Sequence, residues 1–208
     1  MSTPRLAFRL PGAWEQFSPD ESKKLETHVR TYVESRLGTS DEHAQLRILL
    51  RRQLQAGLKA ANEAEAESMF ICSEIAPGIP VPVAMTVYSP NDLKMSPSVG
   101  TSPERVMDVF KRGRAESLKE TEDDWAEFAI PRARILRTIR EETTPIIPEI
   151  EDVTTPNLLV DYWYTVPDTK KIIVVGFSSP LADVRNVMIE FFDSIVRASR
   201  FVAVGSDQ

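Results

Sequence analysis

The sequence predicts an α+β protein in which helices pack on both faces of a mostly antiparallel β-sheet, as an α/β/α sandwich. Predicted strands follow one another along the chain instead of alternating strictly with helices, which is typical of antiparallel sheets. The segment 171–178 is apolar at both odd and even positions, as expected of a central strand covered on both faces. Ser-Pro pairs at 18–19, 102–103 and 179–180 place a capping hydroxyl and a proline where helices begin.

The chain begins with a predicted strand and two predicted helices. Residues 5–10 alternate apolar and charged side chains, as a half-buried strand does. An amphipathic helix is predicted over 19–37, because apolar residues recur on one face and Gly38 supplies a natural end. A second helix is predicted over 40–65, where leucines recur at every fourth residue.

A hairpin, a loop and a third helix are predicted next. Segments 67–75 and 82–89 flank a turn that contains Pro-Gly and are predicted to pair as two strands. Residues 89–103 are rich in proline and serine, so this segment is predicted to be a long loop and is the best candidate for a lid. The helix that follows begins at Pro103 and carries an apolar face, although Gly113 weakens its interior.

The last part of the chain is predicted to supply four strands and a final helix. Strands over 125–130 and 132–140 are separated by a proline. The proline-bearing segment 141–157 is predicted to be a second long loop. Strands over 158–166 and 171–178 then flank a Pro-Asp-Thr turn, and the last helix has a wide apolar stripe suited to lying on a sheet.

Length and composition favour one domain in a reducing compartment. At 208 residues with 42% hydrophobic residues, one domain can bury about 70% of the surface that its unfolded chain exposes. We therefore interpret residues 1–208 as a single domain, with 141–157 as a connection inside it, since two strands and a helix rarely stand alone. The only cysteine, Cys72, has no partner within the chain, and we expect the protein to be cytoplasmic.

Charge and hydropathy argue against two classes of partner. The chain carries 25 basic and 31 acidic residues, for a net charge of -6, so its overall field repels phosphate backbones and anionic lipids. No window approaches the roughly 18 apolar residues of a membrane span, and the N-terminus lacks the pattern of a signal peptide. We expect neither nucleic acid nor a membrane among its partners.

The segment GFSSP at 176–180 superficially resembles the nucleophile elbow of hydrolases. That elbow needs a glycine on both sides of its serine, and here a proline takes the second position. The histidine of such a site should follow the serine, but His28 and His43 both precede it. We favour a helix-capping role for Ser178 or Ser179 over nucleophilic catalysis.

Metal, cofactor and phosphate sites have no support in the sequence. The two histidines lie far apart, without the i, i+4 spacing of a helical zinc site. The acidic run 120–124 lacks the alternating ligands and central glycine of a calcium loop, and we interpret it as a solvated turn. Because no glycine-rich phosphate loop occurs either, we expect no cofactor.

Four residues are candidates for contact with a partner. Twofold alternation places Arg132, Arg134 and Arg140 on one face of their strand. Such a row could bind an acidic partner, but we favour a solvated face or an edge protected against aggregation. Trp163 has polar neighbours on its own face of a strand, so it could anchor a partner or pack under a helix.

Two pieces of the chain carry a resemblance to known proteins. One is the opening Phe8-Arg9-Leu10-Pro11-Gly12-Ala13-Trp14, and the other runs from Tyr164-Thr165-Val166-Pro167 through 174–180 to Phe191-Phe192-Asp193-Ser194-Ile195. The first resembles an F-x-L-P-x-x-W opening, and the second a closing hairpin and helix, of PsbP-like α/β proteins and related uncharacterised actinobacterial proteins. The resemblance implies an antiparallel sheet between helical layers, in a fold used mainly for binding rather than for catalysis.

These observations lead to three expectations about function. The first is a non-enzymatic interaction or accessory module, similar to a chaperone or adaptor, which presents a sheet face or the proline-rich loops to another protein. The alternative is a small-ligand binder or hydrolase-like enzyme with a pocket under the 89–103 loop. The third is self-association into a homo-oligomer through an exposed sheet edge.

Overall fold

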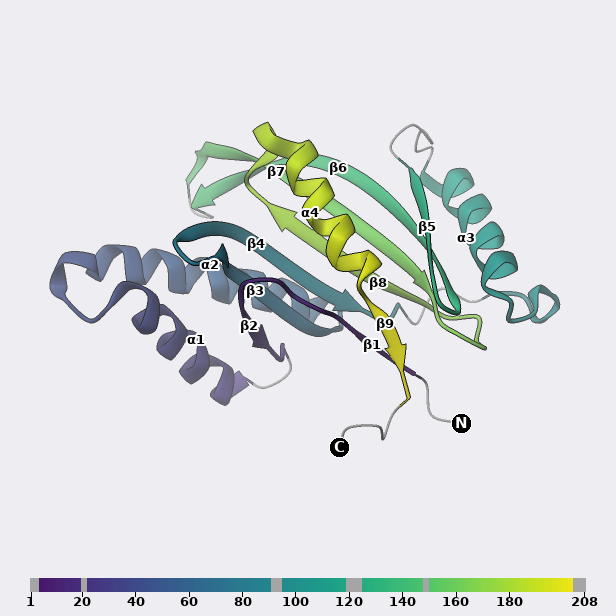
Figure 1. Ribbon diagram of the computed structural model, residues 1–208. Coiled ribbons are helices and arrows are strands. Elements are labelled where there is room, and N and C mark those ends of the chain that lie inside the picture. The colour runs from purple at the N-terminus through teal and green to yellow at the C-terminus, as the bar shows by residue number, and fades with distance from the viewer. Residues whose placement is uncertain (1–3, 20–21, 91–94, 119–124, 148–149, 204–208) are drawn as a thin grey trace.

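A large antiparallel sheet with helices on both of its faces forms the molecule (Figure 1). The computed structural model describes residues 4–19, 22–90, 95–118, 125–147 and 150–203. In this part of the chain the helices are α1 (Ser22–Leu37), α2 (Ala44–Glu63), α3 (Pro103–Leu118) and α4 (Arg185–Arg197). The strands are β1 (Arg5–Ala7), β2 (Ala13–Phe17), β3 (Ala66–Ala76), β4 (Ile79–Tyr88), β5 (Ala126–Ile130), β6 (Ala133–Ile147), β7 (Ile150–Thr165), β8 (Ile172–Ser179) and β9 (Arg200–Val202).

Strand β8 takes the middle of the main sheet. The seven strands of this sheet have the order β2-β3-β4-β8-β7-β6-β5, and all of the neighbours pair antiparallel. Strands β1 and β9 form a separate two-stranded sheet. The predicted α+β class with a mostly antiparallel sheet is confirmed. Strands β2 and β9 were not predicted, because each is short and lacks a run of alternating apolar residues.

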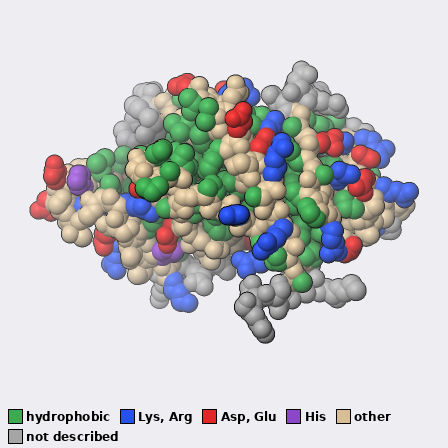
Figure 2. All heavy atoms as spheres, viewed as in Figure 1, with side chains coloured by type: hydrophobic (Ala, Val, Ile, Leu, Met, Phe, Trp, Pro, Cys, Tyr) green, Lys and Arg blue, Asp and Glu red, His purple; other side chains and the backbone are tan. Residues whose placement is uncertain are grey.

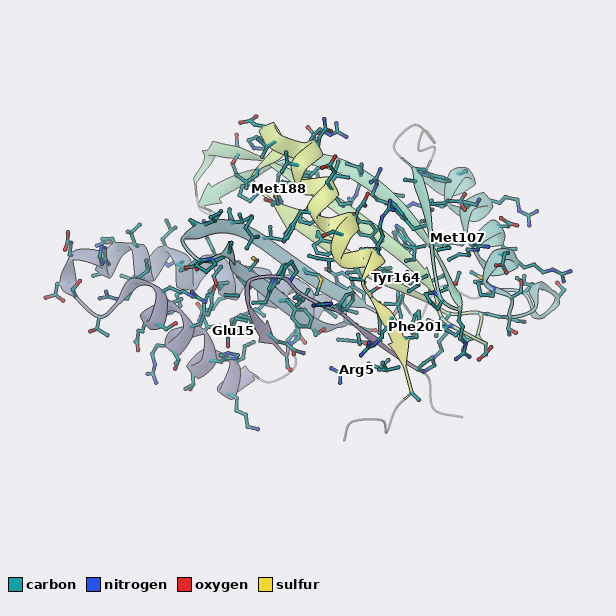
Figure 3. The ribbon with its side chains drawn as sticks, viewed as in Figure 1. Arg5, Glu15, Met107, Tyr164, Met188 and Phe201 are labelled. Carbon is teal, nitrogen blue, oxygen red and sulfur yellow. The ribbon has the colours of Figure 1, made fainter. Side chains whose placement is uncertain are left out.

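The helices divide between the two faces of the sheet, which we call the α4 face and the α2/α3 face. On the α4 face, Phe192 of α4 stacks on Phe177 of β8, with ring centroids 4.5 Å apart. On the opposite face, α1 and α2 pack near the β2 end of the sheet, and α3 packs over β6 and β8. Figure 3 labels Met188 on α4 and Met107 on α3, which are buried in clusters on opposite faces.

Strand β8 is apolar on both sides, and both sides are covered. Ile173, Val175 and Phe177 belong to the cluster under α4. Ile172 and Val174 belong to the cluster under α3. The prediction that this segment is an interior strand is therefore confirmed.

A mostly buried polar contact ties α4 to the sheet. The phenol of Tyr162 donates a hydrogen bond to Asp193 Oδ1 at 2.6 Å, and Arg137 Nη1 lies 2.7 Å from Asp193 Oδ2. The Arg137 and Asp193 side chains are only 17% and 15% exposed. A carboxylate at this depth is tolerated because it has both a cationic and a neutral donor.

The prediction of a loop over 141–157 is wrong, because this segment continues β6 and β7 as one long hairpin. Thr143 pairs with Pro156, and Pro145 pairs with Thr154. In the described residues, β5 pairs with β6 only as far as Arg137, and β8 pairs with β7 only from Leu158 onward. The outer edges of this two-stranded ribbon are thus free, and a proline is tolerated where its missing N–H would face outward.

The Ser-Pro pairs differ in how closely they mark a helix start. Ser102 caps α3 as predicted, because its hydroxyl accepts a hydrogen bond from the Arg105 N–H at 3.4 Å. The Ser179 hydroxyl accepts from the Leu181 N–H at 3.3 Å and so begins a turn, but α4 starts only at Arg185, after a short 3-10 turn. The pair at 18–19 precedes α1, whose first turn adjoins residues outside the described part of the chain.

We predict that the folded protein resists tyrosine ionisation at pH 10. Burial raises the pKa of each of the four tyrosines, Tyr32, Tyr88, Tyr162 and Tyr164, above the usual 10.0. The folded state therefore holds these protons to a higher pH than the unfolded state does. Stability from this source is complete below pH 10 and is lost as the pH rises through the raised pKa values.

Tyrosinate absorbance and circular dichroism, recorded together against pH, measure this effect. The absorbance should stay flat through pH 10 and then rise in one step with the loss of ellipticity. A gradual rise centred at pH 10, in a protein that keeps its ellipticity, would contradict the burial of the phenols.

Candidate functional site

An open groove of about 720 Å³ lies on the α2/α3 face of the sheet. The end of α2 forms one wall, and the end of β4 with the residues after it forms another. Trp163, which packs on α3, closes the opposite side. The described lining residues are Glu63, Ala64, Glu65, Tyr88, Ser89, Pro90, Arg140, Asp161, Trp163 and Val174.

Strand pairing places the floor of the groove in two rows. The first row crosses β4, β8 and β7 through Tyr88, Val174 and Trp163. The second row crosses the same strands through Thr86, Gly176 and Asp161. Side chains two apart on a strand point to the same face, so both rows face α2 and α3.

Gly176 lets two side chains of neighbouring strands approach each other in the second row. A Cβ at this position would lie 3.0 Å from Asp161 Oδ1 and 3.7 Å from Tyr88 Cε2. The Asp161 carboxylate and the Tyr88 ring therefore take up the space beside the glycine. A larger residue at this position would displace the Asp161 carboxylate.

Asp161 and Arg140 form the charged part of the groove. Arg140 Nη2 lies 3.1 Å from Asp161 Oδ2, and Arg140 Nη1 lies 3.0 Å from Glu142 Oε1. The Asp161 side chain is 17% exposed, whereas that of Arg140 is 47% exposed. Arg140 thus compensates the more buried carboxylate from the solvent side.

Trp163 is both a core residue and a wall of the groove. Its ring lies 5.0 Å from that of Phe110 on α3, and the Arg114 guanidinium lies over it at 4.4 Å. Its Nε1–H donates a hydrogen bond to the buried Thr138 hydroxyl at 3.2 Å. The two interpretations of Trp163 from the sequence are therefore compatible: one part of the indole packs under a helix, and another lines the groove.

The phenol of Tyr88 is held in its neutral form. Burial raises its pKa, the negative charge of Asp161 raises it further, and a hydrogen bond with Thr86 opposes both effects. At neutral pH Tyr88 therefore contributes an uncharged ring to the groove.

The lining of the groove is more acidic than basic. Its described residues include three carboxylates, from Glu63, Glu65 and Asp161, and one guanidinium, from Arg140. The sequence predicted Arg140 and Trp163 but missed the acidic residues, Tyr88 and Gly176. Two signals were available: Asp161 is a charged residue within an apolar strand, and Gly176 interrupts an apolar run.

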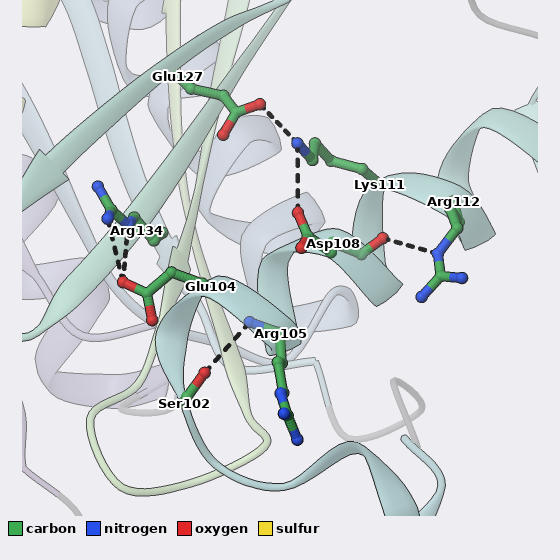
Figure 4. Close-up of polar contacts among 8 residues, drawn as sticks. All are labelled: Ser102, Glu104, Arg105, Asp108, Lys111, Arg112, Glu127 and Arg134. Atoms are coloured by element: carbon green, nitrogen blue, oxygen red, sulfur yellow. Dashed lines mark hydrogen bonds and ion pairs between the residues drawn. The ribbon is translucent and has the colours of Figure 1, made fainter.

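The predicted row of arginines is not one surface, which corrects the sequence-based interpretation. Arg132 lies in the turn between β5 and β6 with φ of 68° and pairs with Asp168. Because of this turn, the twofold alternation does not extend to residue 132. Arg134 does lie on β6, but it pairs with Glu104 of α3 at 3.0 Å (Figure 4). Only Arg140 reaches the groove.

A second open groove, of about 700 Å³, lies between α3 and β5. Its central cation, Lys111, lies 2.6 Å from Glu127 and 3.6 Å from Asp108 (Figure 4). Both contacts raise the pKa of Lys111, with the hydrogen bond to Glu127 as the main cause. The groove beside α2 is the better candidate because Trp163 and Arg140, two of the residues predicted from the sequence, line it.

The serines and histidines noted in the sequence lie in separate places. Ser179 is buried and begins the turn before α4. His28 Nε2 lies 2.5 Å from Glu15 Oε1, and His43 Nδ1 lies 3.1 Å from the carbonyl of Leu37. The described residues contain no group of three or more His, Cys, Asp or Glu side chains placed to hold a metal ion. The run 120–124 lies outside the described residues.

The 89–103 segment borders the groove only at its start. Ser89 and Pro90 belong to the lining. Further along, Met95 and Val99 pack against the cluster of α3, so apolar side chains fill the space beneath that part of the segment. Residues 91–94 lie outside the described part of the chain.

An apolar patch lies on the opposite side of the sheet. Figure 2 shows hydrophobic side chains gathered on the near face beside α4 and over the region of the β3–β4 hairpin. Exposed large apolar residues occur at Ile79, Val184 and Val187, the last of them 65% exposed.

Comparison with protein-family models and with curated proteins finds no match to this chain. The resemblance to PsbP-like proteins therefore stays a prediction. No helix in the described residues is both long and apolar enough to cross a membrane.

We predict that Trp163→Ala lowers the free energy of unfolding by about 2–3 kcal/mol, because a large ring is removed from a half-buried site against Phe110. Trp163→Phe keeps most of this packing and loses the hydrogen bond to Thr138, so it should cost about 1 kcal/mol. Urea denaturation measures both values. If neither variant lowered the free energy of unfolding, the indole would not pack on α3.

Proposed function

We propose that this protein is a non-enzymatic interaction module that holds a segment of another protein in the groove beside α2. The observation that carries the proposal is the juxtaposition of Trp163, Tyr88 and Asp161 on an open part of an otherwise covered sheet face. Partly exposed aromatic residues next to charged groups are typical of protein-binding surfaces.

The shape of the groove favours a chain segment over an enclosed ligand. The groove is open along the sheet, and its lining is more polar than apolar. Enclosed small-molecule sites are mostly apolar cavities that surround their ligand. An extended segment, by contrast, can lie in an open groove with most of its backbone still in water.

A small-ligand binder remains the second candidate. Its support is the volume of about 720 Å³, which falls within the usual range for ligand sites. The residues Ser89 and Pro90, at the start of the 89–103 segment, would then border the ligand.

A photo-crosslinker at Glu63 tests the proposal, with Glu42 as the matched control position. Both are exposed glutamates: Glu63 is the last residue of α2, and Glu42 lies in the 3-10 turn just before the helix. They are about 30 Å apart, given the rise of 1.5 Å per residue. In extracts of the native host, position 63 should give protein adducts that position 42 does not. Trp163→Ala, once shown to fold, should reduce those adducts.

Each outcome separates the candidates. Adducts of a protein at position 63 alone support the interaction module. An adduct of small-molecule mass at position 63 supports the second candidate instead. Equal adducts at both positions, or none at position 63, would count against any use of the groove.

A further inference from the structure

We propose that an open hollow between α1 and α2 binds a phosphate group, with Arg30 and Arg51 as its two cationic ligands. The hollow has a volume of about 320 Å³, and its described lining residues are Glu26, Thr27, Arg30, Arg51 and Gln55. It shares none of these residues with the groove beside α2, so the inference does not depend on the proposed function.

The packing of α1 on α2 brings the two arginines to the same hollow. Val29 of α1 and Leu54 of α2 are buried in one cluster. Arg30 directly follows Val29, and Arg51 lies one helical turn before Leu54, so each arginine borders the buried face of its helix. The two cationic side chains therefore reach the hollow from opposite helices.

The arginines of the hollow lack partners, whereas the other arginines of these two helices have them. The Arg36 guanidinium lies over a tyrosine ring at 5.4 Å, and Arg47 donates hydrogen bonds to two backbone carbonyls that follow α1. Arg52 also interacts within the chain. In the described part of the chain, no ion pair or side-chain hydrogen bond engages Arg30 or Arg51. Their charges are thus available to a ligand.

The Arg51 guanidinium is already partly removed from water. Its Nε is buried and has no hydrogen-bond partner among the described residues, whereas Nη1 and Nη2 are not buried. Buried N–H groups in native structures nearly always have an acceptor. Because this guanidinium has lost part of its hydration, it gives up less water on pairing with an anion than a fully solvated one does.

The charges around the hollow favour an anion, and their placement favours phosphate. The described lining carries two guanidinium groups and one carboxylate, from Glu26. Residues 22–63 include eight basic and five acidic side chains, although the whole chain has a net charge of -6. A phosphate dianion can accept a guanidinium fork on each of two pairs of oxygens, whereas a carboxylate has only one such pair. Two arginines on opposite helices therefore suit phosphate better.

A second hollow adjoins the first and suits an apolar substituent on the phosphate. It has a volume of about 380 Å³ and shares Glu26 and Gln55 with the phosphate hollow. Its lining includes the apolar side chains of Leu25, Val29 and Leu58. An organic group attached to the phosphate can lie against these side chains, so the test compares free phosphate with a phosphate ester.

An NMR titration of the full chain tests the inference. The backbone amide signals of Arg30 and Arg51 are followed as inorganic phosphate, phenyl phosphate or benzoate is added at constant ionic strength. We expect both phosphates to shift these signals saturably, and benzoate to bind about tenfold more weakly because it has a single charge and one pair of oxygens. Tighter binding of phenyl phosphate would indicate an ester as the ligand, and equal binding would indicate free phosphate.

Arg51→Gln and Arg52→Gln form a matched pair of variants. Both remove a guanidinium from neighbouring positions of α2, but Arg52 does not line the hollow. Arg51→Gln should weaken phosphate binding about tenfold, because one charge-assisted pair is lost, and Arg52→Gln should leave it nearly unchanged.

Glu26→Gln gives a change of opposite sign, which a loss of folding does not produce. It removes the one carboxylate of the described lining, so phosphate should bind about threefold more tightly. This variant keeps the inference testable if Arg51→Gln does not fold.

Several results would overturn the inference. These are equal effects of Arg51→Gln and Arg52→Gln, weaker binding after Glu26→Gln, benzoate binding as tight as that of phosphate, or no saturable shift up to about 20 mM phosphate. The three variants leave the described lining of the groove beside α2 unchanged, so the crosslinking test of the proposed function stands or fails separately.

Discussion

Burial of β8 on both of its faces is the constraint on which the rest of the structure depends. Five of its apolar side chains, Ile172, Ile173, Val174, Val175 and Phe177, are less than a tenth exposed. Each buried side chain of this kind stabilises the folded state by about 1.5–3 kcal/mol. Because the net stability of a typical domain is only about 5–15 kcal/mol, exposing one face of this strand would remove a large part of it. The strand therefore needs a helical layer above and below it.

The groove arises where that coverage is incomplete. On one face α4 covers β8, and Asp193 fixes the helix to Tyr162 and Arg137 of the sheet. On the other face the cover is divided between α2 and α3, and the groove between them is lined by Asp161 as well as by the large side chains of Tyr88, Val174 and Trp163. The same two-sided strand thus holds the molecule together and, beside α2, also contributes Val174 to an open groove.

The sequence predicted the parts of the fold that depend on local pattern. The apolar residues at both odd and even positions of 171–178 placed β8 in the interior, and Ser102 marked the start of α3. The prediction of a loop over 141–157 was wrong because of its prolines. A proline is compatible with a strand when its position faces an unpaired edge. Which edge is unpaired depends on strands that are distant in sequence, so the sequence pattern alone does not show it.

The candidate site was predictable only in part for a similar reason. Trp163 and Arg140 stood out as an aromatic and a charged residue on strands. Their meeting with Tyr88 and Glu65 depends on the register of β4, β8 and β7 and on where α2 ends. Arg132 was grouped with them by alternation alone, and a turn with positive φ removes it.

Hydrogen exchange followed by mass spectrometry tests the central place of β8 most directly. We predict that amides of residues 172–177 exchange most slowly in the protein, with an opening free energy equal to that of global unfolding. Amides of 143–147 and 150–156 should exchange much sooner, because these parts of β6 and β7 pair on one side only within the described residues. Exchange of 172–177 at the same rate as that ribbon would contradict a fold organised around an interior strand.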